Sequence, residues 1–212
     1  MKQMRLSSIN TTDIAPSDDA TETIESGIDK HSRAGAVAVT ELGLQGDVVV
    51  DGEHHGGPDQ AIYAYSLDDY RWWEQQLGKS LEPGTFGDNL TIEGMPTDMN
   101  VGDRLLIGEV VLEATAPRIP CATLSRQMRD SGFALRFRRA ERPGIYFRVL
   151  NEGDVSAGDE VTFVADSSAS VSISDLVRAY YDLSPDRNEL RRLLDAPIAT
   201  RLRAKFEAKL AS

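Results

Sequence analysis

The chain has 212 residues, 41% of them hydrophobic and 27% charged, which is enough to bury a substantial core. Its formal net charge of −11 makes it a poor electrostatic partner for phosphate backbones and anionic lipids, so we expect neither a nucleic acid nor a membrane as partner. No apolar run could span a bilayer, the first ten residues lack an apolar signal core, and one cysteine cannot form an internal disulfide, which together favour a cytoplasmic protein.

The chain changes from polar to strand-forming near residue 36. Residues 11–26 (TTDIAPSDDATETIES) are acidic and polar with no apolar period, which predicts a solvated loop. Later runs rich in β-branched and aromatic residues predict short strands, and therefore a β-barrel or a β-sandwich. These runs are residues 36–42, 46–51, 61–66, 89–94, 103–108, 109–115, 144–150 and 160–165. Gly-Asp pairs, most of which we expect to form tight turns, begin at Gly46, Gly87, Gly102, Gly153 and Gly158.

Two helices are expected to interrupt the strands. In residues 66–78, Ser66 is placed to cap the start of a helix and Gly78 to end it. In residues 132–142, Phe133 and Phe137 are four positions apart and would share one helical face.

Three further amphipathic helices are expected at the C-terminal end of the sequence. We predict a strand-rich domain over residues 1–165, a Ser-rich linker over 166–172 and a small three-helix unit over 173–212. Ser172 or Ser174 would cap the first helix of this unit, and Pro185 would take the first position of the second. The last helix would present Ile198, Leu202, Phe206 and Leu210 at steps of four.

The three-helix unit has about forty residues, a size at which a hydrophobic core alone is marginal. We therefore expect it to dock, either on its own strand-rich domain or on a second subunit, which leaves a homodimer open. Tyr180 and Tyr181 are adjacent and cannot both face the core of the unit, so one of them is left for the docking surface.

Cys121 lies in the segment EATAPRIPCATLSRQM, between rigid and charged neighbours. A lone cysteine is commonly only a small buried apolar residue. Here Pro117 and Pro120 stiffen the backbone and should keep it away from regular pairing, while Arg118 places a permanent cation near the thiol. That charge would favour the thiolate, so we expect a partly exposed, reactive Cys121 that acts as a nucleophile or as a soft metal ligand.

Two glycine-containing segments are candidates for a ligand pocket. In the segment GEHHGGPDQ, the adjacent His54 and His55 are too few for a zinc site. The segment is either a surface turn or a place where bare backbone approaches a bulky ligand, with His55 facing it and His54 facing away. The segment PGTFGDNL, with Gly87 and Asn89, is either another pocket edge or a plain hairpin.

These segments, in this order, resemble the MOSC domain family, named for the C-terminal domain of molybdenum cofactor sulfurase, and within it the YiiM-like branch. The resemblance rests on GLQGD, HHGGPDQAIYAY, PGTFGDNLTIEG, VGDRLLIG, APRIPCATL and GIYFRVL, and it covers residues 28–163. The C-terminal residues resemble the 3-alpha domain that follows MOSC in such proteins.

The resemblance implies a barrel-like fold that binds a molybdopterin-type molybdenum cofactor. It gives Cys121 the role of ligating molybdenum or carrying sulfur, and Arg118 belongs to the same motif. Asp88 stands where the family usually has Glu, and Ala122-Thr123 stand where Tyr-Lys is common, which puts any contact of that pair in doubt. The implied cofactor-binding residues are His55, Gly56, Gly57, Asp59, Gly87, Asn89, Arg118 and Lys30.

A phosphate-bearing cofactor in an acidic protein needs a local basic pocket. Our candidates for its cations are Lys30, Arg33 and Arg118, with Arg138, Arg139 and Arg148 as lesser ones.

Two functions remain open. The first is a reductase of N-hydroxylated compounds, such as hydroxylated bases and hydroxylamines. It would take electrons from an external donor protein, because the sequence has neither a cysteine cluster for an iron–sulfur centre nor a GxGxxG loop. The second is a carrier that holds sulfur as a persulfide on Cys121, or holds the cofactor for delivery. A barrel that serves only as an interaction module would bind no cofactor.

Overall fold

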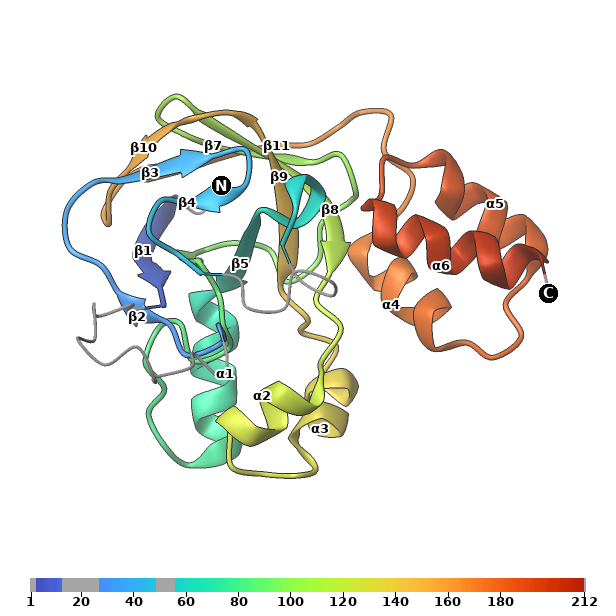
Figure 1. Cartoon of the computed structure of the whole chain (residues 1–212), viewed down its shortest axis with the longest axis horizontal. Helices are drawn as coiled ribbons and strands as arrows, with labels where there is room; N and C mark the ends of the chain where they lie inside the picture. The colour runs from blue at the N-terminus through green and yellow to red at the C-terminus, as the bar shows by residue number, and fades with distance from the viewer. Residues whose placement is uncertain (1–2, 13–26, 49–55, 212) are drawn as a thin grey trace, which may run out of the picture.

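The computed structural model describes residues 3–12, 27–48 and 56–211. Figure 1 shows a barrel of strands with helices at one end and a helical unit packed against one side. Most of the predicted polar loop, much of the predicted strand over residues 46–51, and both His54 and His55 lie outside the described residues.

Seven strands form a closed mixed barrel in the order β11-β7-β8-β9-β5-β6-β1, which the pairing of β1 with β11 completes. The pair β5–β6 is parallel and the other pairs of the barrel are antiparallel. Of the two architectures that the sequence predicted, the β-barrel is therefore confirmed and the β-sandwich is not. Its strands are β1 (Met4–Thr11), β5 (Ile62–Ser66), β6 (Leu90–Glu93), β7 (Arg104–Ile107), β8 (Val110–Pro117), β9 (Ile145–Asn151) and β11 (Glu160–Val164).

Four short strands of the described residues lie outside the barrel circuit. β2 (His31–Ser32) pairs with the end of β1. A separate small sheet has the order β10-β3-β4, from β3 (Val37–Thr40), β4 (Gly43–Leu44) and β10 (Gly153–Val155). Most of the Gly-Asp pairs were expected to form tight turns, and the Gly153-Asp154 pair is an exception because it lies in β10. The glycines of the other four pairs do have the positive φ that a tight turn uses.

Aromatic packing holds two helices against one end of the barrel. Helix α1 (Leu67–Leu77) begins after Ser66, whose hydroxyl accepts a hydrogen bond from the amide of Asp68, and ends at Gly78 in the left-handed conformation. Both ends are as predicted. The Trp73 ring of α1 stacks on Phe137 of α3 (Phe133–Arg139), with ring centroids 5.8 Å apart. This contact fixes α3 and the segment that precedes it.

Two short elements border the segments that were singled out in the sequence. Helix α2 (Ala122–Gln127) begins directly after Cys121 and was not predicted. The 3-10 helix η1 (Pro58–Gln60) follows Gly57.

The C-terminal residues form α4 (Ile173–Tyr181), α5 (Arg187–Asp195) and α6 (Thr200–Ala211). Of the two serines considered as the cap of α4, Ser172 is the one used, and it forms a capping box with Asp175. Pro185 does not occupy the first position of α5, because Asp186 caps that helix and Pro185 precedes the cap. None of the described helices combines the length and the apolar character needed to cross a membrane.

The helical unit docks on the barrel of its own chain. The amide of Ala199 donates to Thr115 O of β8 at 3.2 Å, and the amide of Ile173 donates to Met99 O at 2.8 Å. Tyr181 is the tyrosine left for the docking surface, since the guanidinium of Arg138 lies 3.7 Å from its ring centroid. Tyr180 instead packs against the core.

Candidate functional site

Cys121 lies on the short segment that joins β8 to α2. β8 continues through Pro117, which pairs with Ile145, so the expectation that Pro117 keeps the backbone away from regular pairing was wrong. Pro117 ends the strand, and Cys121 is extended and half-buried at the start of α2. The expected partial exposure of Cys121 is therefore confirmed.

Arg118 is buried beside this cysteine, with 4% of its surface exposed. Its guanidinium lies over the Tyr63 ring, 5.1 Å from the centroid, and its Nε atom has no hydrogen-bond partner among the described residues. Burial alone would lower the pKa of Arg118, but the charges of Tyr146, Tyr63 and Cys121 outweigh burial and raise it. A buried cation with an unsatisfied donor is a place where an anion binds well.

The turn at Gly87 borders the same guanidinium. Gly87 has φ of 75°, and a Cβ atom there would lie 2.9 Å from Ile28 Cγ1 and 3.2 Å from Arg118 Nη1. Only glycine therefore leaves room for Arg118 at this position. Asn89 ties the turn to the barrel, because its Oδ1 accepts from the amide of Tyr63 at 3.1 Å.

Asp88, between these two residues, is fully buried. Its carboxylate accepts hydrogen bonds from the Tyr70 hydroxyl at 2.5 Å and from Thr91 Oγ1 at 2.6 Å. Burial raises the pKa of Asp88, and the bonds from Thr91 and Tyr70 and the charge of Arg118 oppose that shift. Asp88 thus supports the turn and contributes negative charge near Arg118.

Lys30 reaches the same end of the barrel but is already paired. Its Nζ atom contacts both carboxylate oxygens of Asp47 at 2.5 Å, and Asp47 also accepts from Asn89 Nδ2 at 2.8 Å. Burial lowers the pKa of Lys30, and the charge of Asp47 opposes that shift. Two cations, Lys30 and Arg118, are therefore buried near two carboxylates, those of Asp47 and Asp88. Lys30 could bind a phosphate only by giving up part of its contact with Asp47.

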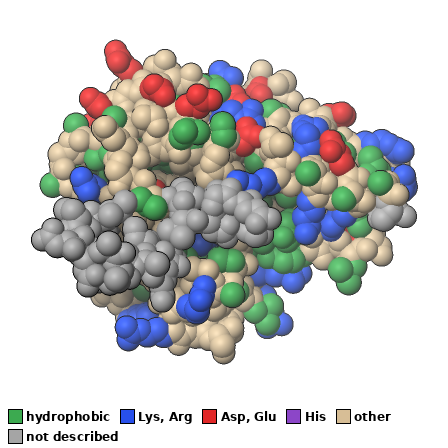
Figure 2. All heavy atoms as spheres, viewed as in Figure 1, with side chains coloured by type: hydrophobic (Ala, Val, Ile, Leu, Met, Phe, Trp, Pro, Cys, Tyr) green, Lys and Arg blue, Asp and Glu red, His purple; other side chains and the backbone are tan. Residues whose placement is uncertain are grey.

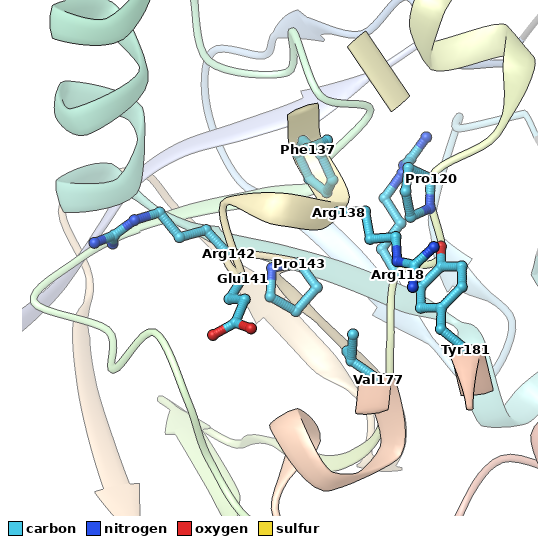
Figure 3. Close-up of a pocket in the computed structure, with 9 residues that line it drawn as sticks. All are labelled: Arg118, Pro120, Phe137, Arg138, Glu141, Arg142, Pro143, Val177 and Tyr181. Carbon is cyan, nitrogen blue, oxygen red and sulfur yellow. The ribbon is translucent and has the colours of Figure 1, made fainter. Parts of the chain in front are cut away.

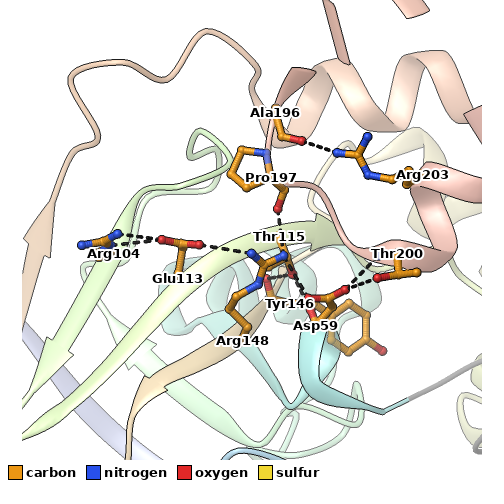
Figure 4. A network of polar contacts seen from close by, with 10 residues as sticks. All are labelled: Asp59, Arg104, Glu113, Thr115, Tyr146, Arg148, Ala196, Pro197, Thr200 and Arg203. Carbon is orange, nitrogen blue, oxygen red and sulfur yellow. Dashed lines mark hydrogen bonds and ion pairs between the residues drawn. The ribbon is translucent and has the colours of Figure 1, made fainter. Parts of the chain in front are cut away.

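The residues Gly56–Asp59 form a turn that carries the docked helical unit. Gly56 and Gly57 have φ of 70° and 82°. The Asp59 carboxylate accepts from Thr200 N at 2.9 Å and Thr200 Oγ1 at 2.5 Å, and pairs with Arg148 Nη2 at 2.9 Å (Figure 4). Burial would raise the pKa of Asp59, but the bonds from Thr200 and the charge of Arg148 lower it. The structure places Asp59 at the boundary with α6.

The other candidate cations have other partners or are exposed. Arg138 stacks on Tyr181 and lines, together with Arg118 and Pro120, a notch between α3 and α4 that Figure 3 shows from close by. Arg148 pairs with Asp59 and with Glu113. Arg33 and Arg139 are exposed.

The sequence analysis missed several residues that complete the site, and each comes from a distant part of the chain. Tyr63 and Tyr146 are neighbouring buried residues beside Arg118, with ring centroids 4.9 Å apart. In the sequence, only their positions in predicted strands indicated that they are buried. Asp47 follows a glycine expected to form a turn, and nothing in its surroundings indicated a pairing with Lys30.

Charge is unevenly distributed on the face that Figure 2 shows. Acidic side chains gather over the barrel edge that carries β3 and β10, whereas Lys and Arg gather around the helical unit and the end formed by α2 and α3. The acidic protein therefore presents basic side chains at the end formed by α2, the helix that begins after Cys121.

Comparison with known proteins gives the family. Residues 51–162 match the MOSC domain, and residues 171–212 match the YiiM-like, 3-alpha helix domain. The chain therefore belongs to the MOSC domain family and carries a YiiM-like 3-alpha helix domain after it.

Individual relatives agree with this assignment. YflK of Bacillus subtilis is 33% identical over 189 residues, which cover 88% of this chain and 85% of that protein. The crystal structure of YiiM from Geobacillus stearothermophilus is similar with a TM-score of 0.81 at 26% identity, covering 98% of this chain and 99% of that one. A protein of Gibberella moniliformis named reductase is 32% identical over 151 residues, which cover 66% of this chain and 26% of that protein.

Proposed function

We propose that this protein binds a molybdopterin-type molybdenum cofactor and reduces N-hydroxylated compounds, with Cys121 as the protein ligand of molybdenum. The observation that carries this proposal is the buried guanidinium of Arg118, whose Nε has no partner among the described residues, beside the half-buried thiol of Cys121. A soft thiolate suits molybdenum, and an unsatisfied guanidinium suits the anionic part of the cofactor.

The residues present fit such a group. Arg118 is the main cation available, since Lys30 is held by Asp47 and Arg148 by Asp59. Gly87 leaves room for the Arg118 guanidinium itself, because a Cβ atom there would lie 3.2 Å from its Nη1 atom. The bound cofactor would supply the two-electron redox chemistry of the reaction.

The chain's own residues would bind and orient the reactants. Reduction of a hydroxylamine to an amine consumes two electrons and two protons and releases water. The electrons would come from an external donor protein, since the sequence contains one cysteine and no dinucleotide-binding loop. The likeness to a fungal protein named reductase is in keeping with this chemistry.

A carrier function is the alternative. The partial exposure of Cys121 supports it as strongly as it supports the reductase. A half-buried thiol can hold a persulfide sulfur and release it to an acceptor. This function needs neither an electron donor nor a substrate pocket.

The test is to produce the protein in cells that make the cofactor, and to measure molybdenum by mass spectrometry and pterin by fluorescence. A single-turnover assay with an N-hydroxylated base and dithionite as electron source follows. Stoichiometric molybdenum and reduction of the base that is lost in Cys121→Ser would support the reductase. Molybdenum or cyanide-releasable sulfur without turnover would favour the carrier, and protein with neither would contradict both functions.

A further inference from the structure

We propose that Arg201 of α6 is a positioning residue of the site, through which the helical unit holds the turn formed by residues 56–60. Docking of that unit and ligand binding at the turn would then be coupled. The identity of the ligand rests on the function proposed above, whereas the positioning role does not.

The guanidinium of Arg201 spans the turn. Its Nη1 atom donates to Gly56 O at 2.7 Å and to Gln60 Oε1 at 2.8 Å, so one side chain joins the first and last residues of the turn. Its Nη2 atom lies 3.9 Å from the position that a Cβ atom would take on Gly57. The side chain thus lies along the Gly56–Gly57 backbone that the family resemblance assigns to the cofactor.

Contacts with the barrel hold the turn from its other side. Asp59 caps the start of α6, because it accepts hydrogen bonds from both the amide and the hydroxyl of Thr200. Thr115 Oγ1 donates to Asp59 O at 2.6 Å, and the amide of Ala199 donates to Thr115 O. The turn is therefore held between β8 on one side and the first residues of α6 on the other.

The turn also lies close to the aromatic rings beside Arg118. Thr115 Oγ1, which donates to Asp59 O of the turn, also lies 3.1 Å from Tyr146 O. The Tyr146 ring is 4.9 Å from the Tyr63 ring, and the Arg118 guanidinium lies 5.1 Å from the centroid of that second ring. The turn, through Thr115, and the buried cation therefore contact the same pair of neighbouring tyrosines.

The physical reason for coupling is the freedom of the two glycines. Adjacent glycines lose more conformational entropy on ordering than any other pair, and both have positive φ here. A turn already held by Arg201 loses less entropy when a ligand binds, and by reciprocity a ligand that orders the turn strengthens the docking of α6. The helical unit, which supplies no residue of the MOSC motifs, would in this way contribute to binding.

Hydrogen–deuterium exchange of the full-length, cofactor-free protein tests the positioning role directly. We expect Arg201→Ala to accelerate exchange of the amides of Gln60 and Thr200 about tenfold, and Arg201→Lys to give an intermediate rate because one ammonium cannot reproduce the guanidinium fork. Arg191→Ala is the matched control, since Arg191 is exposed on α5 and donates to Asn188 of the same helix. It should leave those amides unchanged.

Cofactor retention in the same variants tests the coupling. Protein made in cells that synthesise the cofactor should lose molybdenum at least tenfold faster on dilution in Arg201→Ala than in the wild type or Arg191→Ala. Unchanged exchange at the turn would overturn the positioning role, and faster exchange with unchanged molybdenum loss would overturn the coupling. Wild-type protein without molybdenum would refute the cofactor function, and the exchange data would still decide the role of Arg201.

Discussion

The guanidinium carbon of Arg118 lies 5.1 Å from the centroid of the Tyr63 ring, and the arginine is almost wholly buried. The face of the ring offers a cation–π contact but no hydrogen-bond acceptor, and Nε of Arg118 has no partner among the described residues. Tyr63 uses its own hydroxyl elsewhere, donating to Pro143 O at 2.8 Å. The ring therefore holds the cation in place without neutralising it.

Replacing Arg118 by Met should remove the charge and keep much of the packing volume. A charge-assisted contact to a phosphate is worth about 1.5–3 kcal/mol, so molybdenum retention should fall at least tenfold. Elemental analysis of purified protein measures this. Arg191→Met is the control, because Arg191 is exposed on α5 and donates to Asn188 of the same helix. Undiminished molybdenum in Arg118→Met would remove Arg118 from the site.

Cys121 should react quickly with iodoacetamide near neutral pH in the folded, cofactor-free protein. The reason is that it is half-buried rather than enclosed, and that the permanent charge of Arg118 favours the thiolate. The rate, followed by mass spectrometry, should fall severalfold in Arg118→Met and nearly to zero when cofactor is bound. A cysteine that reacts only after denaturation would contradict this prediction.

Gly87→Ala should disturb the site more than an equivalent change in an open turn. The new Cβ atom would lie 2.9 Å from Ile28 and 3.2 Å from Arg118, which is closer than van der Waals contact, and φ is positive. We expect a loss of about 2–4 kcal/mol in the free energy of unfolding, together with weaker cofactor binding. Gly78→Ala has a similar φ and no atom within 4 Å of the new Cβ, so it should cost about 1 kcal/mol and leave binding intact. Equal losses in urea denaturation would show that the space beside Arg118 is not needed.

Tyr70→Phe should destabilise the protein in a pH-dependent manner. The change removes one of the hydrogen bonds to the buried carboxylate of Asp88, a loss of about 1–3 kcal/mol while Asp88 is ionised. Because burial raises the pKa of Asp88 in the folded state, protonation at acid pH removes the need for that bond. The difference in stability between variant and wild type should therefore be largest near neutral pH and shrink as the pH falls. A difference that is independent of pH would show that Asp88 does not carry the charge assumed here.

Asp59→Asn should loosen the docking of α6. Loss of the carboxylate weakens a helix cap and an ion pair, for which we expect about 1–2 kcal/mol. Since the folded-state pKa of Asp59 lies below the ordinary value of 3.8, its stabilisation is present above that pH and is lost as the pH falls through the folded-state pKa. Wild-type exchange at Thr200 should therefore rise towards the variant's rate only below about pH 4. Asp186→Asn makes the same change at the cap of α5 and should leave this amide unaffected.

Local features of the fold could be predicted from the sequence because their causes are local. The ends of α1 follow from Ser66 and Gly78, and the barrel strands from β5 to β9 follow from runs of β-branched and aromatic residues. Strand β1 gave no such signal. Its Ser8 and Asn10 are polar yet buried, and Asn10 is satisfied by Asp88 and Thr91, some eighty positions away. From the sequence alone, a polar residue is predicted to be exposed unless its distant partner is known.

The sequence by itself determined which chemical groups are available: one cysteine, an arginine three positions before it, and two glycine-rich turns. Only the tertiary structure decided what each group is free to do. In the folded chain, Lys30 is paired with Asp47, and Asp59 caps a helix that begins 141 positions later. Arg118 is buried with an unsatisfied donor. The reason is that an ion pair or a hydrogen bond depends on distances of a few ångströms between atoms. Those distances are set by barrel closure and by docking of the helical unit, and no spacing along the chain encodes them.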